Sequence, residues 1–384
     1  MATTGTNGKT TTTSMVAAIV DAAGEPSARL TTVGAWVCGE QVPNPTPQEE
    51  FLFTVERAIA AGVRTLALET TSKALAAGLA QRWPAHVAVF TNLTRDHLDM
   101  HGTPEMYLAS KAQLFIALPP GGTAVLNADD ESSALLREVM PDHAHVERYS
   151  ARDARGCALA ARAVEVAPDG TRIALADGAF ARELGGELEL AVAGGVHAQN
   201  ALGAALAARA AGYGAEAIRA GLRAFRGVPG RFEVVGRAPL VVVDYAHTPD
   251  GLVGTLATAR ELCRGGGRVI CVFGCGGDRD RGKRPQMGAV VDERADLAVL
   301  TTDNPRREDP AAIAADVRAG APSPRARWIA ELDRARAIAL AIAEARPDDV
   351  VVIAGKGHER TQEIRGVEHP FSDADVARAA IAAR

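Results

Sequence analysis

The sequence opens with the stretch Thr4-Gly5-Thr6-Asn7-Gly8-Lys9-Thr10-Thr11. Gly5 and Gly8 allow a tight backbone turn whose N–H groups point at phosphate oxygens, and Lys9 can reach the β- and γ-phosphates of a nucleotide. Thr10 offers a hydroxyl to Mg²⁺, and the following helix presents its positive end to the phosphates. Residue 3 is Thr, so the strict G-x-x-x-x-G-K-[ST] pattern fails, and a merely Gly/Thr-rich terminus is the alternative. We expect Gly5, Thr6, Asn7, Gly8, Lys9, Thr10 and Thr11 to form a phosphate-binding loop.

A phosphate loop normally follows a buried strand, but only Met1, Ala2 and Thr3 precede this one. We therefore expect one of three explanations. The start is misassigned, the chain is a fragment, or the first strand is missing.

Short apolar runs alternate with Ala-rich helical patterns along most of the chain. The strand candidates are Thr65–Glu69, Val87–Thr91, Thr123–Asn127, Leu240–Asp244, Arg268–Phe273, Leu297–Thr302 and Asp348–Ala354. Helices are expected over Thr10–Ala23, Pro249–Leu262, Pro310–Ala319 and Ala335–Ala345. Continuous apolar strands separated by helices indicate parallel sheets, so the predicted fold class is α/β.

Two features divide the chain. Residues 157–196 alternate polar and apolar side chains between Gly turns, which predicts an antiparallel β insertion. After a helical pair at 200–225, the turn cluster Gly227-Val228-Pro229-Gly230 suggests a boundary. We predict two domains, 1–228 and 229–384.

Composition excludes several classes of protein. The 384 residues are 47% hydrophobic and 23% charged, a globular balance, and 42 basic against 47 acidic residues give a net charge of −5. Such a chain has no overall electrostatic attraction to nucleic acid or to an anionic membrane. No apolar run is long enough for a transmembrane helix, and the N-terminus lacks a signal-peptide core. The five cysteines are odd in number and lack CxxC spacing, which favours reduced thiols in a cytoplasm.

Seven further motifs follow the loop in order. They are Thr91-Asn-Leu-Thr-Arg-Asp-His97-Leu-Asp99, Tyr107-Leu-Ala-Ser-Lys111-Ala-Gln-Leu-Phe115, Gly230-Arg-Phe-Glu233, Asp244-Tyr-Ala-His-Thr-Pro249, Phe273-Gly-Cys-Gly-Gly-Asp-Arg-Asp280, Asp303-Asn-Pro-Arg306 and Gly355-Lys-Gly-His-Glu359. Together with the loop, this set resembles the Mur ligase family over nearly the whole chain. It is most similar to the MurE branch, the UDP-N-acetylmuramoyl-tripeptide synthetases. Folylpolyglutamate synthases share the loop, but the last two motifs argue against them.

The resemblance implies a fold, a reaction and cofactors. It implies a P-loop ATP-binding central domain followed by a Rossmann-like C-terminal domain, with the family's N-terminal uridine-binding domain absent from this sequence. The implied reaction is ATP-dependent amide ligation through an acyl phosphate, which adds meso-diaminopimelate to UDP-N-acetylmuramoyl-L-alanyl-D-glutamate in peptidoglycan precursor synthesis. The implied cofactors are ATP and Mg²⁺.

The resemblance also implies roles for individual residues. Thr10, Glu69, His97 and a carbamylated Lys111 would serve the metal, while Lys9, Lys111, His97, Arg231 and His247 would be catalytic. Asn200, Arg231 and Asp244 would join the phosphate loop in binding ATP. From the pattern alone, His97 is equally a capping or core histidine and Lys111 a surface lysine whose stem lies along apolar surface. Arg279, Asp303, Asn304, Arg306, Gly355 and Glu359 would bind the amino acid, with Arg306 gripping its distal carboxylate.

The acceptor side departs from the family pattern. Thr46, Ser72 and Lys73 are the acceptor candidates, but Lys73 replaces a family histidine, Leu79 replaces an arginine, and the usual Asn-Thr-Thr-Pro reads Asn44-Pro45-Thr46-Pro47. Two alternatives therefore stay open. One is a Mur-like ligase with a different acceptor, and the other is an inactive nucleotide-binding fragment. We expect a cytoplasmic monomer with small-molecule substrates and no nucleic acid or membrane partner.

Overall fold

The computed structural model describes residues 1–43 and 46–384, apart from the side chains of residues 47 and 48. Asn44 and Pro45 of the acceptor-side motif therefore lie outside the described residues. The chain divides into two compact units. The first comprises Met1–Thr94 and His101–Arg226, and the second comprises Arg95–Met100 and Gly227–Arg384. The short helix α5 (Leu98–His101) spans the end of the Arg95–Met100 segment.

The first unit is built on an eleven-stranded sheet in the order β11-β10-β9-β8-β7-β6-β1-β5-β2-β3-β4. Its strands are β1 (Ala2–Thr4), β2 (Ser27–Thr31), β3 (Gly34–Val37), β4 (Glu40–Gln41), β5 (Thr65–Glu69), β6 (Val87–Phe90), β7 (Thr123–Asn127), β8 (His145–Ser150), β9 (Leu159–Ala167), β10 (Gly170–Leu175) and β11 (Glu187–Leu190). The strands from β2 to β9 in this order are parallel, whereas β3 and β4 at one edge and β10 and β11 at the other are antiparallel.

The first strand is present, so one of the three explanations for the early loop, a missing strand, is wrong. Residues Ala2–Thr4 form β1 in the middle of the sheet, where Ala2 pairs with Leu68 on β5 and with Ala88 on β6. Three residues suffice because both neighbouring strands supply parallel partners. Strand β1 leads directly into the phosphate loop.

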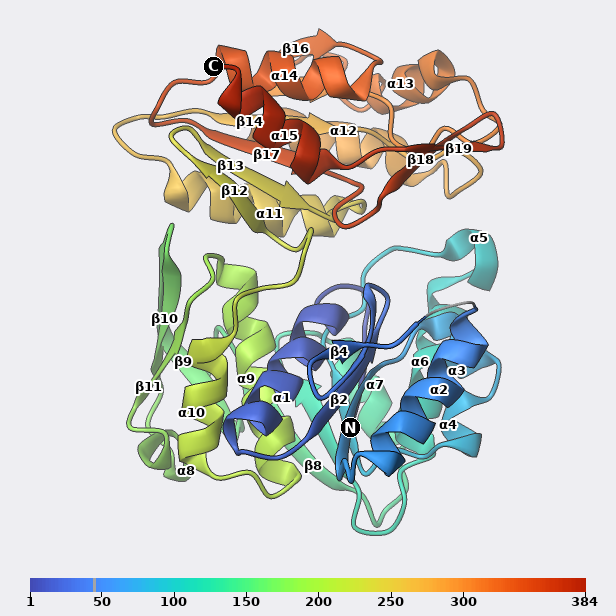
Figure 1. Cartoon of the computed structure of the whole chain (residues 1–384), viewed down its shortest axis with the longest axis vertical. Coiled ribbons are helices and arrows are strands. Elements are labelled where there is room, and N and C mark those ends of the chain that lie inside the picture. Colours follow the sequence, from blue (N-terminus) through green and yellow to red (C-terminus); the bar gives the residue numbers. More distant parts are fainter. Residues whose placement is uncertain (44–45) are drawn as a thin grey trace. The chain divides into compact units, whose positions relative to one another are not determined.

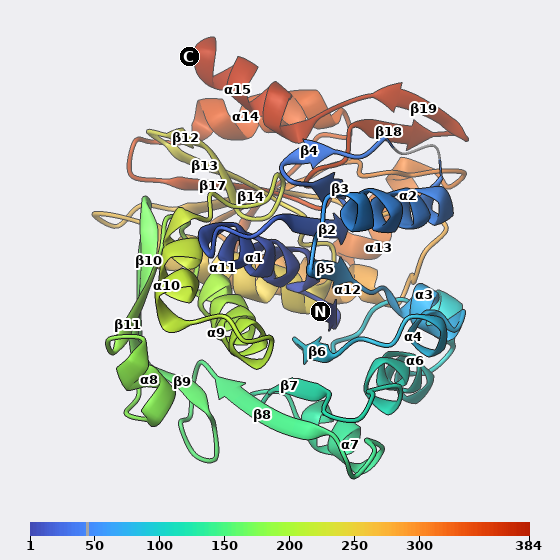
Figure 2. The same cartoon turned by 60° about the horizontal axis from the view of Figure 1, so that its bottom comes forward.

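Helices cover both faces of this sheet. They are α1 (Lys9–Ala22), α2 (Pro47–Ala60), α3 (Ser72–Ala76), α4 (Leu79–Arg82), α6 (Pro104–Ile116), α7 (Ser132–Glu138), α8 (Ala179–Glu183), α9 (Gly195–Ala210) and α10 (Ala215–Ala224). Helices α1, α9 and α10 pack side by side, and α3 and α4 pack on α6 (Figures 1 and 2). Phe90, Phe115 and Leu126 centre a core between the sheet and α6.

The second unit is a doubly covered, mostly parallel sheet in the order β12-β13-β17-β14-β15-β16, with a separate hairpin. Its strands are β12 (Glu233–Arg237), β13 (Leu240–Asp244), β14 (Val269–Phe273), β15 (Leu297–Leu300), β16 (Arg327–Ala330), β17 (Val350–Ala354) and the hairpin β18 (Thr361–Ile364) and β19 (Val367–Pro370). Only β12 runs antiparallel to its neighbour in the six-stranded sheet.

Five helices cover the second sheet. They are α11 (Pro249–Leu262), α12 (Lys283–Arg294), α13 (Pro310–Arg318), α14 (Arg334–Glu344) and α15 (Asp373–Ala382). Helices α14 and α15 pack on one face, where Ile338, Ile342 and Ala377 meet the strand residues Val272 and Val351 (Figure 1). The predicted α/β class holds for both units. In each, the loops that follow the parallel strands carry several of the candidate site residues, and others lie on helices such as α6 and α9.

Candidate active site

The phosphate loop links β1 to α1, and two of its N–H groups are already engaged. Helix α1 begins at Lys9 after Gly8, whose φ of 85° lies in the left-handed region. Thr6 N donates to Asn92 O, and Asn7 N donates to Asn92 Oδ1, each at 2.8 Å. The expectation that these N–H groups point at phosphate oxygens is therefore wrong for Thr6 and Asn7. Asn92 was quoted in a motif but not predicted as a site residue.

Glu69, at the end of β5, faces the start of α1. Its Oε2 accepts hydrogen bonds from Thr10 Oγ1 at 2.9 Å and from Thr32 N at 3.0 Å. Lys9 Nζ donates to Thr6 O at 2.8 Å. A carboxylate beside a hydroxyl is the hard-oxygen donor set that Mg²⁺ prefers. Thr32 lies in no motif, so sequence reasoning missed it.

Lys111 on α6 is 1% exposed, and its side chain contacts the phosphate loop. Its Nζ donates to Gly5 O at 2.7 Å and lies 4.3 Å from the centre of the Tyr107 ring. Tyr107 and Phe115 are buried on the same helix face, as the spacing predicted. The alternative of a surface lysine is wrong.

Asn200 on α9 is buried against the loop. Its Oδ1 accepts from Thr12 Oγ1 at 3.3 Å, and a Cβ added to Gly8 would lie 2.3 Å from the same oxygen. Thr11 is also buried. The structure therefore brings Asn200 to the phosphate loop.

The three acceptor candidates lie at the starts of two helices of the first unit, α2 and α3. Thr46 caps α2 by accepting from Glu49 N at 3.3 Å, and it is exposed. Ser72 is buried at the start of α3, with Oγ 2.9 Å from His101 Nε2. Lys73, the next residue, is exposed.

A cavity of about 210 Å³ lies in the second unit at the carboxyl ends of its parallel strands. All six predicted amino-acid-binding residues line it. They are Arg279, Asp303, Asn304, Arg306, Gly355 and Glu359. His97, Tyr245 and His247 also line it.

One wall of the cavity is a buried polar network around Asn304. Asn304 Nδ2 donates to Glu359 Oε2 at 2.7 Å, and its Oδ1 accepts from Lys356 Nζ at 2.9 Å. Lys356 Nζ also donates to Glu359 Oε2 at 2.8 Å. Lys356 is fully buried and was missed as a site residue, although its motif had been quoted. One oxygen of Glu359 is therefore held by the protein itself.

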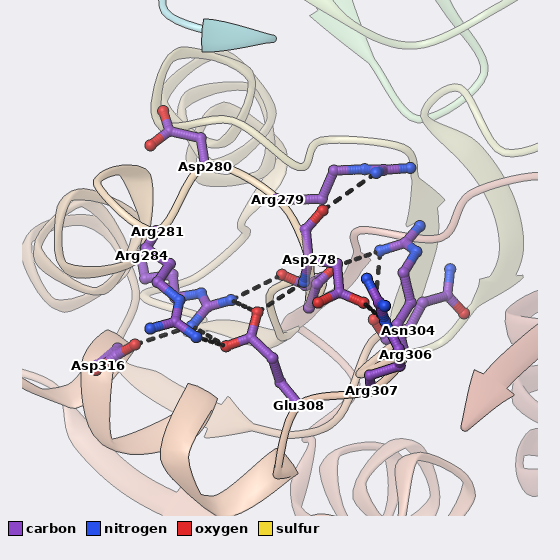
Figure 3. Close-up of polar contacts among 12 residues, drawn as sticks. Asp278, Arg279, Asp280, Arg281, Arg284, Asn304, Arg306, Arg307, Glu308 and Asp316 are labelled. Carbon is purple, nitrogen blue, oxygen red and sulfur yellow. Dashed lines mark hydrogen bonds and ion pairs between the residues drawn. The ribbon is translucent and has the colours of Figure 1, made fainter. Parts of the chain in front are cut away.

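Arginines form another part of the lining. Arg306 Nη1 donates to Gly277 O at 2.8 Å, and its Nε lies 3.3 Å from Glu363 Oε2. Arg279 is more exposed, and its Nη1 donates to Asp278 O at 3.2 Å (Figure 3). Two cationic groups thus lie on one cavity, as a carboxylate-binding site requires.

Asp96, like Asp303, is a buried acidic group of the cavity. Its Oδ2 lies 3.4 Å from His247 Nε2 and 3.3 Å from His97 Nε2, and its Oδ1 lies 3.6 Å from Lys283 Nζ. Burial alone would raise the pKa of this carboxyl, but the hydrogen bond and charge of His247, with Lys283 and His97, lower it overall. Neither Asp96 nor Lys283 was predicted as a site residue.

His97 belongs by its contacts to the second unit, while Glu69 belongs to the first. His97 has a φ of 53°, which non-glycine residues rarely adopt. The predicted meeting of Glu69 and His97 thus stays a prediction. Within the described residues, no three His, Cys, Asp or Glu side chains gather in a way that could hold a metal ion.

Arg231 and Asp244 are joined through the backbone of the turn before β12. Asp244 Oδ2 accepts from Phe232 N at 2.7 Å, and its Oδ1 accepts from Ala246 N at 2.9 Å. Burial raises the pKa of Asp244 overall, although these hydrogen bonds act to lower it. The Arg231 guanidinium lies 4.1 Å from the centre of the Tyr245 ring. Asp244 therefore orients the turn that carries Arg231.

No helix in the described part of the chain is long and apolar enough to cross a membrane. Residues 3–208 match the Mur ligase middle domain, and residues 230–357 match the Mur ligase glutamate ligase domain. A UDP-N-acetylmuramoyl-L-alanyl-D-glutamate–2,6-diaminopimelate ligase of Synechococcus elongatus is 42% identical over 99% of this chain and 76% of its own length. The ligase of the same name from Xanthomonas campestris is 40% identical over 99% of this chain and 77% of its own length.

Solved structures also superpose on this chain. A UDP-N-acetylmuramoyl-L-alanyl-D-glutamate–2,6-diaminopimelate ligase, 35% identical, superposes with a TM-score of 0.67 over 100% of this chain and 78% of that one. A Mycobacterium tuberculosis folylpolyglutamate synthase complexed with ADP and AMPPCP superposes with a TM-score of 0.73 over 100% of this chain and 90% of that one. At 22% identity, the second likeness concerns the fold alone.

Proposed function

The chain belongs to the Mur ligase family, and from that premise we propose that it joins 2,6-diaminopimelate to UDP-N-acetylmuramoyl-L-alanyl-D-glutamate with ATP. The observation that carries the proposal is that Arg279, Arg306, Asn304 and Glu359 line one and the same cavity. A substrate with an ammonium and a carboxylate at its far end needs both cationic and anionic groups. An amino acid such as lysine, whose far end is a cation alone, would bring no carboxylate to these arginines and would add a like charge beside them.

In the proposed reaction, an acceptor carboxylate oxygen attacks the γ-phosphorus of ATP. The bond to the bridging oxygen breaks, and ADP leaves. The amine of the amino acid then attacks the acyl phosphate carbon and loses one proton to a neighbouring base, an amide bond forms, and phosphate departs with the electrons of the C–O bond. The protein's contribution is to position these anions and offset their charge. Lys9 and Arg231 are the cations we assign to the phosphates, and His247 is the basic side chain we place at the attacking amine.

Thr10 and Glu69 fit a bound Mg²⁺, since they present a hydroxyl and a carboxylate 2.9 Å apart. The ion would offset the charge of the nucleotide phosphates. We assign His97 to the metal on the resemblance of its motif. Asn200 and Asp244 are assigned to the nucleotide.

Lys111 is the residue that we propose to be carbamylated. Its neutral amine would add to CO₂ and lose one proton, which would replace a buried cation with an anion beside the phosphate loop. The proposal predicts that removing bicarbonate lowers the rate of turnover and that restoring it recovers the rate.

Thr46, Ser72 and Lys73 are assigned to the acceptor. A different acceptor is the second candidate, because the apolar Leu79 stands where the family has an arginine, and it lines a separate cavity with Leu75, Trp83 and Leu114. We also propose that the chain acts as a monomer in the cytoplasm.

The test is phosphate release by the purified chain with ATP, Mg²⁺ and the muramoyl dipeptide, with meso-diaminopimelate or L-lysine added in turn. Release that depends on diaminopimelate supports the proposal. Release with another acceptor only would favour the second candidate. ATP binding without release under any acceptor would indicate an inactive nucleotide-binding protein.

A further inference from the structure

Arg279 and Arg306 lie on two irregular loops rather than on helices or strands. The first loop, residues 274–282, connects β14 to α12, and the second, residues 301–309, connects β15 to α13. Asp278 and Arg306 both have a φ of 52°. Non-glycine residues in this region cost free energy and persist only where the surroundings hold them. Something must therefore fix the two loops.

Glu308, on the second loop, contacts the first loop and the helix behind it. Its Oε1 accepts from Asp278 N at 2.6 Å and from Arg284 Nη2 at 2.8 Å. Its Oε2 accepts from Arg284 Nη1 at 3.1 Å and from Arg281 Nη2 at 2.8 Å. Figure 3 shows the Glu308 carboxylate between Arg284 and Asp278.

Arg284 is an unusual anchor because its side chain is 1% exposed. It also donates to Asp316 Oδ2 at 2.9 Å and to Gly276 O at 3.3 Å. The hydrogen bonds and charge of Arg284 lower the pKa of Glu308 to about 2, so Glu308 is ionised at neutral pH. A buried, doubly hydrogen-bonded pair of this kind fixes geometry more strictly than an exposed pair.

The two loops also approach each other directly. Gly277 N donates to Asn304 O at 2.9 Å, and Arg306 Nη1 donates back to Gly277 O. A Cβ on Gly277 would lie 1.9 Å from Pro305 O, so the two loop backbones pack directly against each other here. A shift at Asp278 would therefore reach both Arg279, its neighbour, and Arg306.

We propose that Glu308 is a positioning residue that sets the places of Arg279 and Arg306 and so selects an amino acid with a second carboxylate. The proposal rests on the proposed function. Glu308 touches no substrate in this assignment. It acts through the backbone of Asp278 and through the buried Arg284.

Two variants separate positioning from folding. Glu308→Gln removes the charge that faces Arg284. Glu308→Asp keeps that charge but is one methylene shorter, so it cannot hold Arg284 and reach Asp278 N at once. Glu293→Gln is the matched control. It removes the same charge at a position on α12 that is 60% exposed and lies outside the site.

The measurements are kcat, the KM for diaminopimelate, the KM for ATP, the preference for diaminopimelate over lysine, and the melting temperature. Both Glu308 variants should raise the KM for diaminopimelate roughly tenfold or more, since a hydrogen bond to a charged group is worth about that factor. The preference over lysine should shrink, while the KM for ATP stays unchanged. Glu293→Gln should match the wild type in every measurement.

A folded Glu308→Asp with the wild-type KM for diaminopimelate and the wild-type preference would overturn the inference. So would a rise in the KM for ATP equal to that for diaminopimelate, which would indicate a general structural effect. If Glu308→Gln does not fold, Glu308→Asp alone decides. A wild-type chain that does not use diaminopimelate would instead refute the proposed function, and the inference would fall with it.

Discussion

Lys111 on α6 donates a hydrogen bond from its Nζ to the carbonyl oxygen of Gly5 in the phosphate loop, 2.7 Å away. The two residues are 106 positions apart in the sequence. A fully buried amine thus supports the backbone of the loop. The shape of the loop therefore depends on a distant helix, and no local sequence pattern predicts that contact.

Lys111→Met should weaken the use of ATP more than it weakens the fold. Methionine cannot donate to Gly5 O or carry the carbamate that we propose on Lys111, and this loss should lower kcat/KM for ATP at least about tenfold. Methionine fills a similar volume, and removing a buried charge relieves a desolvation cost, so the melting temperature should change little. Phosphate release against ATP concentration measures the first effect. Arg137→Met on α7, at an exposed position, is the control, and an unchanged ATP dependence in Lys111→Met would refute the argument.

Gly5→Ala should disrupt both the loop and stability. Gly5 has a φ of 151°, and an added Cβ would lie 1.9 Å from Thr91 Oγ1 and 3.0 Å from the backbone N of Asn92. Thr91 cannot move freely because its Oγ1 donates to Asn7 O at 2.6 Å. We expect a loss of about 1–3 kcal/mol of unfolding free energy, and roughly 2–4 °C in melting temperature for each kcal/mol.

Gly24→Ala is the matched control for Gly5→Ala. Gly24 also has a positive φ, of 76°, but an added Cβ would meet nothing within 4 Å. It should therefore lose only the backbone term, about 1 kcal/mol, and retain full turnover. Equal melting temperatures for the two variants would show that the close contact at Gly5 is unimportant.

Arg306→Lys should change the choice of amino acid. Lysine keeps the charge but loses the planar fork that binds Gly277 O and faces Glu363. The KM for diaminopimelate should rise roughly tenfold or more, while the KM for ATP stays the same. Arg327→Lys, a 60% exposed residue paired with Glu344 in the same unit, should leave both constants unchanged. An unaltered KM for diaminopimelate in Arg306→Lys would remove this arginine from the site.

The parts of the fold that depend on local pattern were predicted from the sequence. Thr65–Glu69 and Leu240–Asp244 are strands at the predicted bounds, because a buried parallel strand is a continuous apolar run. Helix α11 begins and ends as predicted, since Thr248 caps it and Pro249 takes its first position. β1 was missed because three residues form a strand only when two distant neighbours pair with them.

The candidate site was predictable only where motifs carry it. Motif residues gave the amino-acid-binding set, and all six residues line one cavity. The partners of these residues were not predictable. Lys356, Asp96 and Glu308 act through burial or through contacts between residues far apart in the chain. The spacing of residues within a motif predicts neither burial nor such contacts. The same holds for Asn92, whose backbone and side chain hold the phosphate loop.

His197 on α9 should make the stability of the first unit depend on pH. The side chain is 2% exposed, and neither ring nitrogen has a hydrogen-bond partner among the described residues. Burial lowers its pKa from 6.5 to about 4. Between these values the unfolded chain binds a proton that the folded chain does not, so stability falls as the pH drops from 6.5 towards 4.

His197→Leu should abolish this part of the pH dependence. Between pH 7 and pH 5 the wild type should lose about 2 kcal/mol more unfolding free energy than the variant, because each unit of pKa shift corresponds to about 1.4 kcal/mol. Urea unfolding at the two pH values measures the difference, and comparison with the wild type cancels the other titrating groups. His145→Leu, at an exposed position on β8, should keep the wild-type dependence. If His197→Leu loses as much stability on acidification as the wild type, the argument is wrong, because the pKa of His197 would then be the same in the folded and unfolded chain.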